Sequence, residues 1–166
     1  PETGRPVPAG EEGELVFTTL NREAMPLIRY KSHDISRLVP EPCVCGASSL
    51  LKIDTVKKRL ESTATIGVGD EIYPVLFDDA LFDISGVVDY QIIASRVNGI
   101  DQLTFKVEMA PHQAGEISEI SRKLRSDPVI AKNLSARRIL EPEIEIVPWG
   151  GLASVGRAKK LIDDRR

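Results

Sequence analysis

The chain has 166 residues, of which 42% are hydrophobic and 28% charged, and its formal net charge is −3. This balance is typical of one globular domain or two small ones, and because there is no basic surplus, nucleic acid is not an expected partner. No run of about 18 apolar residues predicts a transmembrane helix, so no membrane partner is expected either. Two cysteines and no visible N-terminal signal indicate a cytoplasmic protein. Since the chain begins at Pro1 without a methionine, we interpret it as a piece of a longer protein.

The first part of the chain predicts short antiparallel strands. β-branched and aromatic residues indicate strands at residues 14–20 and 25–30, and alternation indicates a third at 35–39 after a polar turn at 31–34. A further strand is expected at 50–56. Such strands cannot bury a core alone. We therefore expect them to belong to a larger body, and their open edges offer a route to a homodimer.

The charged run after these strands is typical of a linker, and the pattern changes beyond it. Later residues predict an order of two strands, helix, two strands, helix and strand. This order indicates an α+β fold with a small split βαβ (ferredoxin-like) sheet and helices packed on one face. The expected elements are a ribbon at 63–66 and 71–73 around the Gly67–Asp70 turn, a helix from Pro74, strands at 87–95 and 103–109, a helix at 112–125, a short helix or turn at 128–134, and a strand around 144–146.

The end of the chain is rich in small residues and then in cations. Residues 154–163 predict a flexible turn followed by the start of an amphipathic helix. Two interpretations are open for the basic group. It is either a solvated, frayed terminus or a mobile cationic loop that meets a phosphate or carboxylate. The cations are Arg157, Lys159, Lys160, Arg165 and Arg166.

Five stretches of this sequence resemble the phenylacetate–CoA ligases of the adenylate-forming superfamily. Residues 13–30 contain GELVFTTL and EAMPLIRY, which are similar to the densest motif of that family. Residues 30–34 (YKSHD) resemble its Y-R-T-x-D, and residues 42–46 (PCVCG) its P-C-x-C-G. Residues 58–61 (KRLE) resemble G-R-x-D, and residues 154–158 (SVGRA) resemble S-x-G-K-A. The resemblance spans nearly the whole chain, although residues 62–140 match more by element order than by residue.

The resemblance implies a C-terminal fragment of an ATP-dependent acid–CoA ligase. Residues 1–57 would be the last strands of the large nucleotide-binding domain, residues 58–61 a hinge, and residues 62–166 a mobile lid. A carboxylate would attack the α-phosphate of ATP to give an acyl-adenylate and pyrophosphate, and coenzyme A would then displace AMP. The implied cofactors are ATP, Mg²⁺ and coenzyme A. The implied partners are a small-molecule carboxylate substrate and the upstream N-terminal domain of the same polypeptide, without which this fragment is expected to be inactive.

Three residues of the first 61 acquire roles from the resemblance. Asp34 corresponds to the aspartate that accepts hydrogen bonds from the ribose hydroxyls, and a carboxylate has acceptors for two such hydroxyls; the alternative is a turn aspartate that caps nearby N–H groups. Arg59 would contact the ribose or phosphate, and its alternative is a solvated linker cation. Glu61 takes the position of the hinge aspartate, with the acid kept but lengthened.

Other residues are assigned to the phosphates, the thiol and a metal. Arg157 occupies the position of the family's adenylation lysine. Arginine is a planar fork and does not simply replace the point charge of a lysine ammonium group, so Lys159 is the alternative cation for this role. Gly69 would lie in the loop that faces coenzyme A; the alternative, a hairpin turn that requires positive φ, is compatible with this role. Cys43 and Cys45 would supply two ligands of a structural Zn²⁺ completed by the preceding domain, and the alternative is two free thiols.

Two further hypotheses change the function. An adenylating enzyme of the same family would pass its acyl group to another acceptor, a deazaflavin cofactor or a carrier protein. A non-catalytic α+β module would bind a partner or a small ligand, and Arg157 would then mark a lost adenylation activity.

Overall fold

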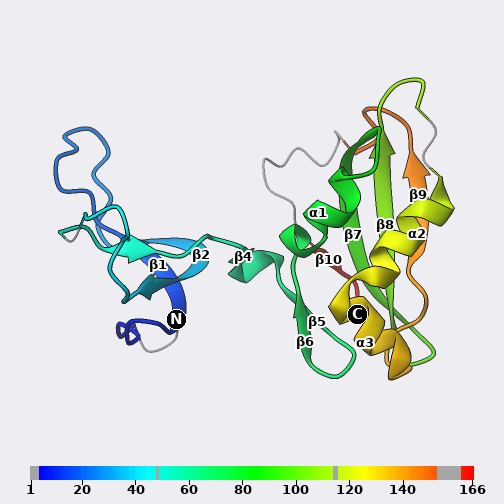
Figure 1. Cartoon of the computed structure of the whole chain (residues 1–166), viewed down its shortest axis with the longest axis horizontal. Coiled ribbons are helices and arrows are strands. Elements are labelled where there is room, and N and C mark those ends of the chain that lie inside the picture. The colour runs from blue at the N-terminus through cyan, green and yellow to red at the C-terminus, as the bar shows by residue number, and fades with distance from the viewer. Residues whose placement is uncertain (1–3, 48, 114–115, 153–161) are drawn as a thin grey trace. The chain divides into compact units, whose positions relative to one another are not determined.

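The computed structural model describes residues 4–47, 49–113, 116–152 and 162–166 (Figure 1). The chain divides into two compact units, Pro1–Glu61 and Ser62–Arg166. The fold is mixed α+β, which confirms the predicted class. No helix of the described residues is long and apolar enough to cross a membrane.

The first unit is a small antiparallel sheet built around one long strand. Strand β2 (Tyr30–Val39) pairs with β1 (Glu12–Phe17), β3 (Lys52–Ile53) and β4 (Lys58–Arg59). Short strands of this kind cannot cover their own apolar residues, and several large ones lie on the surface of this unit. The most exposed are Leu20, Met25, Ile28, Val44, Leu50 and Leu51.

The sequence prediction for residues 25–34 was wrong. Residues 25–29 are irregular, and the expected turn at 31–34 lies inside β2. The reason is that threonine side chains replace strand partners, since the Leu27 N–H donates to Thr19 Oγ1 at 3.0 Å. Met25 also adopts a left-handed φ of 54°, which interrupts an extended strand. The strand expected at 50–56 is reduced to the two residues of β3.

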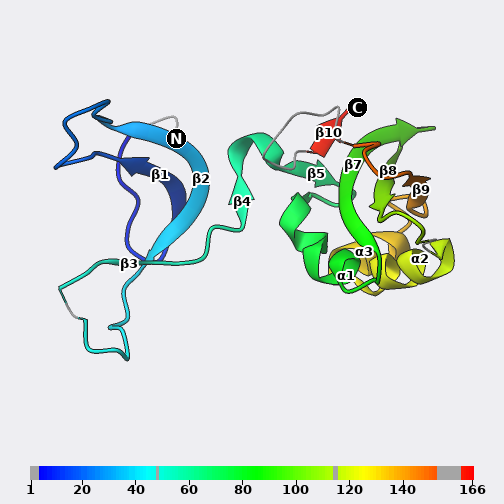
Figure 2. The ribbon, with the colours of Figure 1, turned by 90° about the horizontal axis from the view of Figure 1, so that it is seen from above.

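The second unit carries the main sheet, in the order β10-β7-β8-β9. The central pair, β7 (Val87–Val97) and β8 (Ile100–Met109), is an antiparallel hairpin closed by Asn98-Gly99. On its two sides β9 (Glu143–Val147) runs parallel to β8, and β10 (Ile162–Asp164) runs parallel to β7. Figure 2 shows that α1 (Asp78–Phe82), α2 (Ile117–Ser126) and α3 (Pro128–Ser135) all cover one face of this sheet, as the element order predicted.

The predicted ribbon is confirmed as a separate two-stranded sheet. It consists of β5 (Ala64–Ile66) and β6 (Asp70–Ile72). The 3₁₀ segment η2 (Pro74–Phe77) then leads into α1. Ile66 and Ile72 of the ribbon are 1% and 0% exposed and belong to the same core as the main sheet. The ribbon is therefore held by packing as well as by its own hydrogen bonds.

Alternating residues of β8 form the centre of this core. Leu103, Phe105 and Val107 are fully buried, which agrees with the alternation in the sequence. Phe105 meets Phe77 edge-on at a ring distance of 5.1 Å, a favoured aromatic geometry. Helices α2 and α3 contribute apolar side chains from their inner faces, namely Ile120, Leu124 and Ile130.

The helix predicted to start near residues 161–163 was wrong for the described part of that segment. Residues 162–164 form β10 instead, with Ile162 opposite Ile92 of β7. The edge of β7 offers unpaired backbone groups, and Ile162, which is 9% exposed, joins the hydrophobic core. Pairing and burial together outweigh the helical pattern of a short segment.

The burial of Ile162 gives a stability test of β10. Ile162→Ala should lower the free energy of unfolding of the second unit by roughly 2–4 kcal/mol, because it removes buried methylene groups and leaves a cavity. Leu51→Ala, at a position that is 85% exposed, is the control and should change it by less than about 0.5 kcal/mol. Urea unfolding followed by circular dichroism measures both, and equal effects would contradict the placement of Ile162 in the core.

Candidate functional site

The structure brings Asp34 and Arg59 together across neighbouring strands. Asp34 of β2 is the register partner of Arg59 of β4. Arg59 Nη2 lies 2.5 Å from Asp34 Oδ1, and the two side chains are 28% and 18% exposed. Among the described residues none donates an aligned hydrogen bond to this oxygen. The carboxylate is thus held between the two strands by the charge of Arg59.

The predicted turn around Asp34 is absent, so its expected alternative role as a turn cap has no support here. Its own N–H donates to Ser32 Oγ at 3.2 Å, and the residue before it, His33, has a left-handed φ of 63°. The register of β1 and β2 shifts between Glu14 and Val16. Irregularities of this kind re-aim side chains at functional sites.

Of the other predicted residues at the boundary and near the end, the structure describes Glu61. Glu61 is exposed and lies in a short 3₁₀ segment, η1 (Leu60–Ser62), at the end of the first unit. Arg157 and Lys159 lie outside the described residues.

The two cysteines lie next to each other in a tight turn. Cys45 Sγ is 2.8 Å from Cys43 Sγ, and the Gly46 N–H donates to the Cys43 carbonyl. Both are free thiols. The hydrogen bonds from Cys45 lower the pKa of the Cys43 thiol. Within the described ranges no third His, Cys, Asp or Glu joins them in a group that could hold a metal, and two ligands do not complete a tetrahedral zinc site.

Gly67, Val68 and Gly69, here called the glycine loop, connect β5 and β6. Gly67 and Gly69 have φ values of 56° and 99°, as a hairpin turn requires. The loop borders an open hollow of about 520 Å³ on the second unit. An added Cβ at Gly69 would meet nothing within 4 Å, whereas one at Gly67 would lie 1.8 Å from Asn133 Oδ1. Gly69 therefore faces free space and Gly67 a buried side chain.

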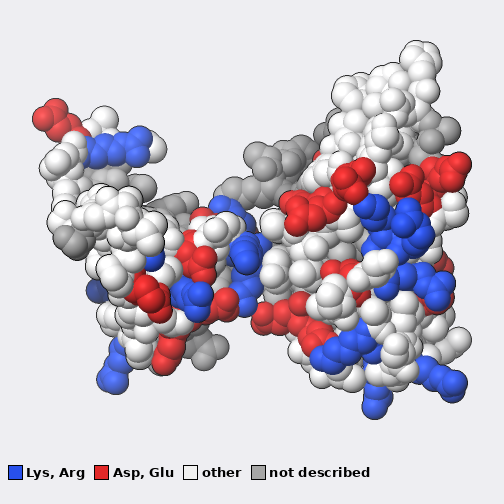
Figure 3. Space-filling model, viewed as in Figure 1, with Lys and Arg blue, Asp and Glu red and all other residues white. Residues whose placement is uncertain are grey.

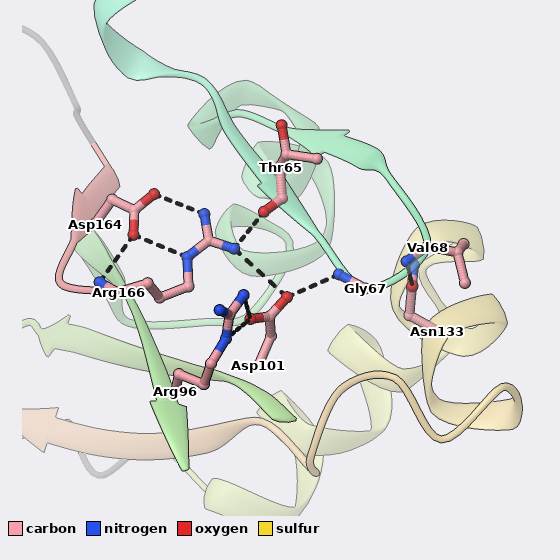
Figure 4. A network of polar contacts seen from close by, with 8 residues as sticks. All are labelled: Thr65, Gly67, Val68, Arg96, Asp101, Asn133, Asp164 and Arg166. Atoms are coloured by element: carbon pink, nitrogen blue, oxygen red, sulfur yellow. Dashed lines mark hydrogen bonds and ion pairs between the residues drawn. The ribbon is translucent and has the colours of Figure 1, made fainter. Parts of the chain in front are cut away.

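A polar network anchors the glycine loop, as Figure 4 shows. The Gly67 N–H donates to Asp101 Oδ2 at 2.9 Å. Arg96 donates to the other oxygen of this carboxylate through Nε and Nη2. Arg166 Nη1 lies 3.4 Å from Asp101 Oδ2 and also donates to the Thr65 carbonyl. Burial acts to raise the pKa of Asp101, but the Gly67 N–H and the two guanidinium groups outweigh it and lower this pKa below its usual value.

A second buried carboxylate of β8 holds a different backbone segment. Glu108 is 6% exposed. Its Oε1 accepts a hydrogen bond from the Gly150 N–H at 2.8 Å, and its Oε2 accepts one from the Leu152 N–H at 3.0 Å. The strand β8 thus uses one carboxylate near each end to fix a loop.

Sequence reasoning missed Asp101, Asn133 and Glu108. The first could have been found, because an Asn98-Gly99 turn places residues 96 and 101 opposite each other and the two carry opposite charges. Asn133 is separated from Val68 by 65 positions, so only the packing of α3 against the ribbon brings them together.

Ion pairs on the outer surface are more exposed than the contacts of Asp101 and Glu108. On the face drawn in Figure 3, acidic and basic side chains are interspersed. Helix α2 carries Arg122 paired with Glu119, Lys123 paired with Asp83, and Arg125 paired with Glu141. Exposed pairs of this kind contribute little to stability. They do not form a single-sign surface on that face.

Comparison with known proteins identifies the family of this chain. Residues 69–165 match the model of the AMP-binding enzyme C-terminal domain, and the chain belongs to this family. It is 37% identical to a phenylacetate-coenzyme A ligase of Thermus thermophilus over 131 residues. This aligned region covers 78% of this chain and 28% of the relative. The chain is 32% identical to a phenylacetate-coenzyme A ligase of Aromatoleum evansii over 173 residues. This aligned region covers 99% of this chain and 37% of the relative.

One solved structure is similar over almost the whole of this chain. The chain is similar to a 2-hydroxyisobutyryl-CoA ligase in the postadenylation state in complex with R3-HIB-AMP. The TM-score is 0.66 and the identity 28%, with 99% of this chain and 35% of that chain covered. The chain spans about a third of the length of the relatives it matches.

The two glycines of the loop should respond differently to alanine. Gly69→Ala should cost about 1–2 kcal/mol of stability, because only the left-handed backbone is strained. Gly67→Ala should cost roughly 2–5 kcal/mol, since the new methyl also collides with Asn133, which is fully buried and hydrogen-bonded to Asp70 and Val129. Urea unfolding of the two variants measures the difference, and a Gly67→Ala variant as stable as Gly69→Ala would contradict the close approach.

The carboxylates of the second unit predict a loss of stability in acid. The pKa of Asp101 is lowered in spite of burial, and the hydrogen bond and charge of Arg166 lower that of Asp164. Groups with lowered pKa stabilise the fold above their unfolded value of about 3.9, and this contribution is lost as the pH falls through the folded value. We expect the melting temperature to fall between pH 4 and pH 2 and Asp101→Asn to reduce that fall; a melting temperature that rises on acidification would contradict this.

Proposed function

We propose that this chain is the C-terminal part of an ATP-dependent, AMP-forming acid–CoA ligase that activates an aryl or related carboxylate. The observation that carries the proposal is the Asp34–Arg59 pair, because both residues were assigned to the nucleotide from separate motifs and they are neighbours across β2 and β4. The names of the relatives, phenylacetate-coenzyme A ligases and a 2-hydroxyisobutyryl-CoA ligase, support the same chemistry.

In this proposal Asp34 accepts hydrogen bonds from the two ribose hydroxyls of ATP. The side chain of Asp34 is 18% exposed and its charge is balanced by the ion pair with Arg59, which supports this role. Arg59 fixes the orientation of the carboxylate through this ion pair and would contact the ribose or a phosphate of the same nucleotide.

The first half-reaction forms the acyl-adenylate. An oxygen of the substrate carboxylate attacks the α-phosphorus of ATP, the bond to the bridging oxygen breaks, and pyrophosphate leaves. Negative charge that develops on the phosphates requires cationic stabilisation. ATP would bring Mg²⁺ for this purpose, and Arg157, or Lys159 in its place, would supply the charge of the chain itself.

The second half-reaction transfers the acyl group to coenzyme A. The thiolate attacks the carbonyl carbon of the adenylate, and AMP leaves with the electrons of the broken C–O bond. The glycine loop would face the thiol arm, and free space at Gly69 supports this assignment. Glu61 would act at the hinge, between a nucleotide-binding part at residues 1–57 and a lid at residues 62–166.

The same proposal includes an upstream domain, a structural metal, a cellular location and an oligomeric state. An upstream N-terminal domain would cover the exposed apolar side chains of the first unit and carry the acyl pocket. It would also supply the ligands that Cys43 and Cys45 lack for a structural Zn²⁺. A cytoplasmic location and a homodimer formed through the edges of the first unit belong to this proposal.

The test compares two aspartates of the first unit in the full-length ligase. Asp34→Ala should raise the KM for ATP in pyrophosphate exchange by roughly 10- to 100-fold, because hydrogen bonds to a charged group contribute about 1.5–3 kcal/mol. Asp54→Ala is the matched control, since Asp54 also pairs with an arginine, Arg37, at 2.9 Å. With phenylacetate as the first substrate tried, an Asp34→Ala enzyme that keeps the KM of Asp54→Ala would refute the ribose role.

A further inference from the structure

The glycine loop has each of its three backbone N–H groups engaged. The Gly69 N–H closes the turn on the Ile66 carbonyl at 3.0 Å. The other two donate to side chains from distant elements, Gly67 to Asp101 of β8 and Val68 to Asn133 of α3. A turn needs only the first of these bonds, so the two side-chain anchors fix the loop beyond the requirement of a hairpin.

Asp101 is the branching point of this network. It is 6% exposed, and its carboxylate meets three donors from three parts of the unit: the Gly67 N–H, Arg96 and Arg166. Arg166 also donates to the Thr65 carbonyl, two residues before the loop. Because a buried carboxylate is costly without its partners, Asp101 holds one position and the loop is built against it.

Asn133 fixes the opposite side of the loop. This residue is fully buried, and its Nδ2 donates to Asp70 Oδ2 at 2.8 Å and to the Val129 carbonyl at 2.9 Å. These bonds orient the amide so that Oδ1 faces the Val68 N–H. The backbone of the loop is thus held on both sides, and Gly69 borders the hollow that Arg96 and Arg166 also line.

We propose that Asp101 is a positioning residue for the thiol-transfer step, which holds the glycine loop in the shape that lets the arm of an acyl-accepting thiol pass over Gly69. The inference rests on the ligase function proposed above. Asp101 touches neither substrate nor cofactor in it and acts through the Gly67 N–H. A loop ordered in advance loses no conformational freedom when the thiol arm binds, and a displacement of about 1 Å at such a site slows a reaction by roughly 100-fold.

The experiment uses the full-length ligase and separates the two half-reactions. Asp101→Ala should leave pyrophosphate exchange within about two-fold of wild type and slow thioester formation from preformed acyl-adenylate by roughly 10- to 100-fold at low coenzyme A. Amide hydrogen exchange at Gly67 and Val68 should become faster in the same variant. Asp101→Asn, which keeps an oxygen for the Gly67 N–H, should recover part of both effects.

Asp83→Ala is the matched control, because Asp83 is an acid of the same unit whose ion pair, in the described part of the chain, is with Lys123 of α2 and not with the glycine loop. If Asp101→Ala leaves hydrogen exchange or the thioester step as in Asp83→Ala, the inference is overturned. If Asp101→Ala fails to fold, the same comparison is made with Asp101→Asn. A wild-type protein that adenylates no carboxylate refutes the ligase function instead, while hydrogen exchange still reports whether Asp101 orders the loop.

Discussion

The hydrogen bonds that β8 makes with its two buried carboxylates organise the second unit. Asp101 and Glu108 lie near opposite ends of this strand, and each accepts backbone N–H groups from another segment: Gly67 in one case, Gly150 and Leu152 in the other. Burying a carboxylate is unfavourable unless donors satisfy it. The positions of the two acids therefore dictate where these segments lie, and the core of β8 between them supplies the rigidity.

The two units differ in how far they bury their apolar side chains. The second unit buries the inner face of β8 under α2 and α3, and Phe77, Leu103 and Phe105 at the centre of its core are fully enclosed. The first unit satisfies its backbone through antiparallel pairing but leaves Leu20, Ile28 and Leu51 on the surface. The pair of Asp34 and Arg59 depends on strand register rather than on a core. Apolar surface of this extent is a feature of domains that pack against further protein.

Local patterns predicted the fold where neighbours in sequence decide it. Alternation identified β8, and Asn98-Gly99 identified the hairpin that places Arg96 against Asp101. Prediction was wrong where distant groups intervene, at residues 25–30, where Thr19 takes a backbone N–H, and at 162–164, where β7 offers an edge. For the site, the resemblance selected Asp34 and Arg59, and the structure places them together. It could not select Asn133, because a link over 65 positions leaves no local signal.

The distribution of anchors bears on how a ligase with two half-reactions would work. The partners that hold the glycine loop, Asp101, Asn133 and Arg166, all belong to the unit Ser62–Arg166, and so does Glu108 with the segment it binds. Neither loop needs the first unit for its shape. If the unit Ser62–Arg166 is the lid of the proposed ligase, each loop would keep its order through both half-reactions, because its partners belong to the same unit. Binding energy would then not be consumed in ordering a loop at each half-reaction.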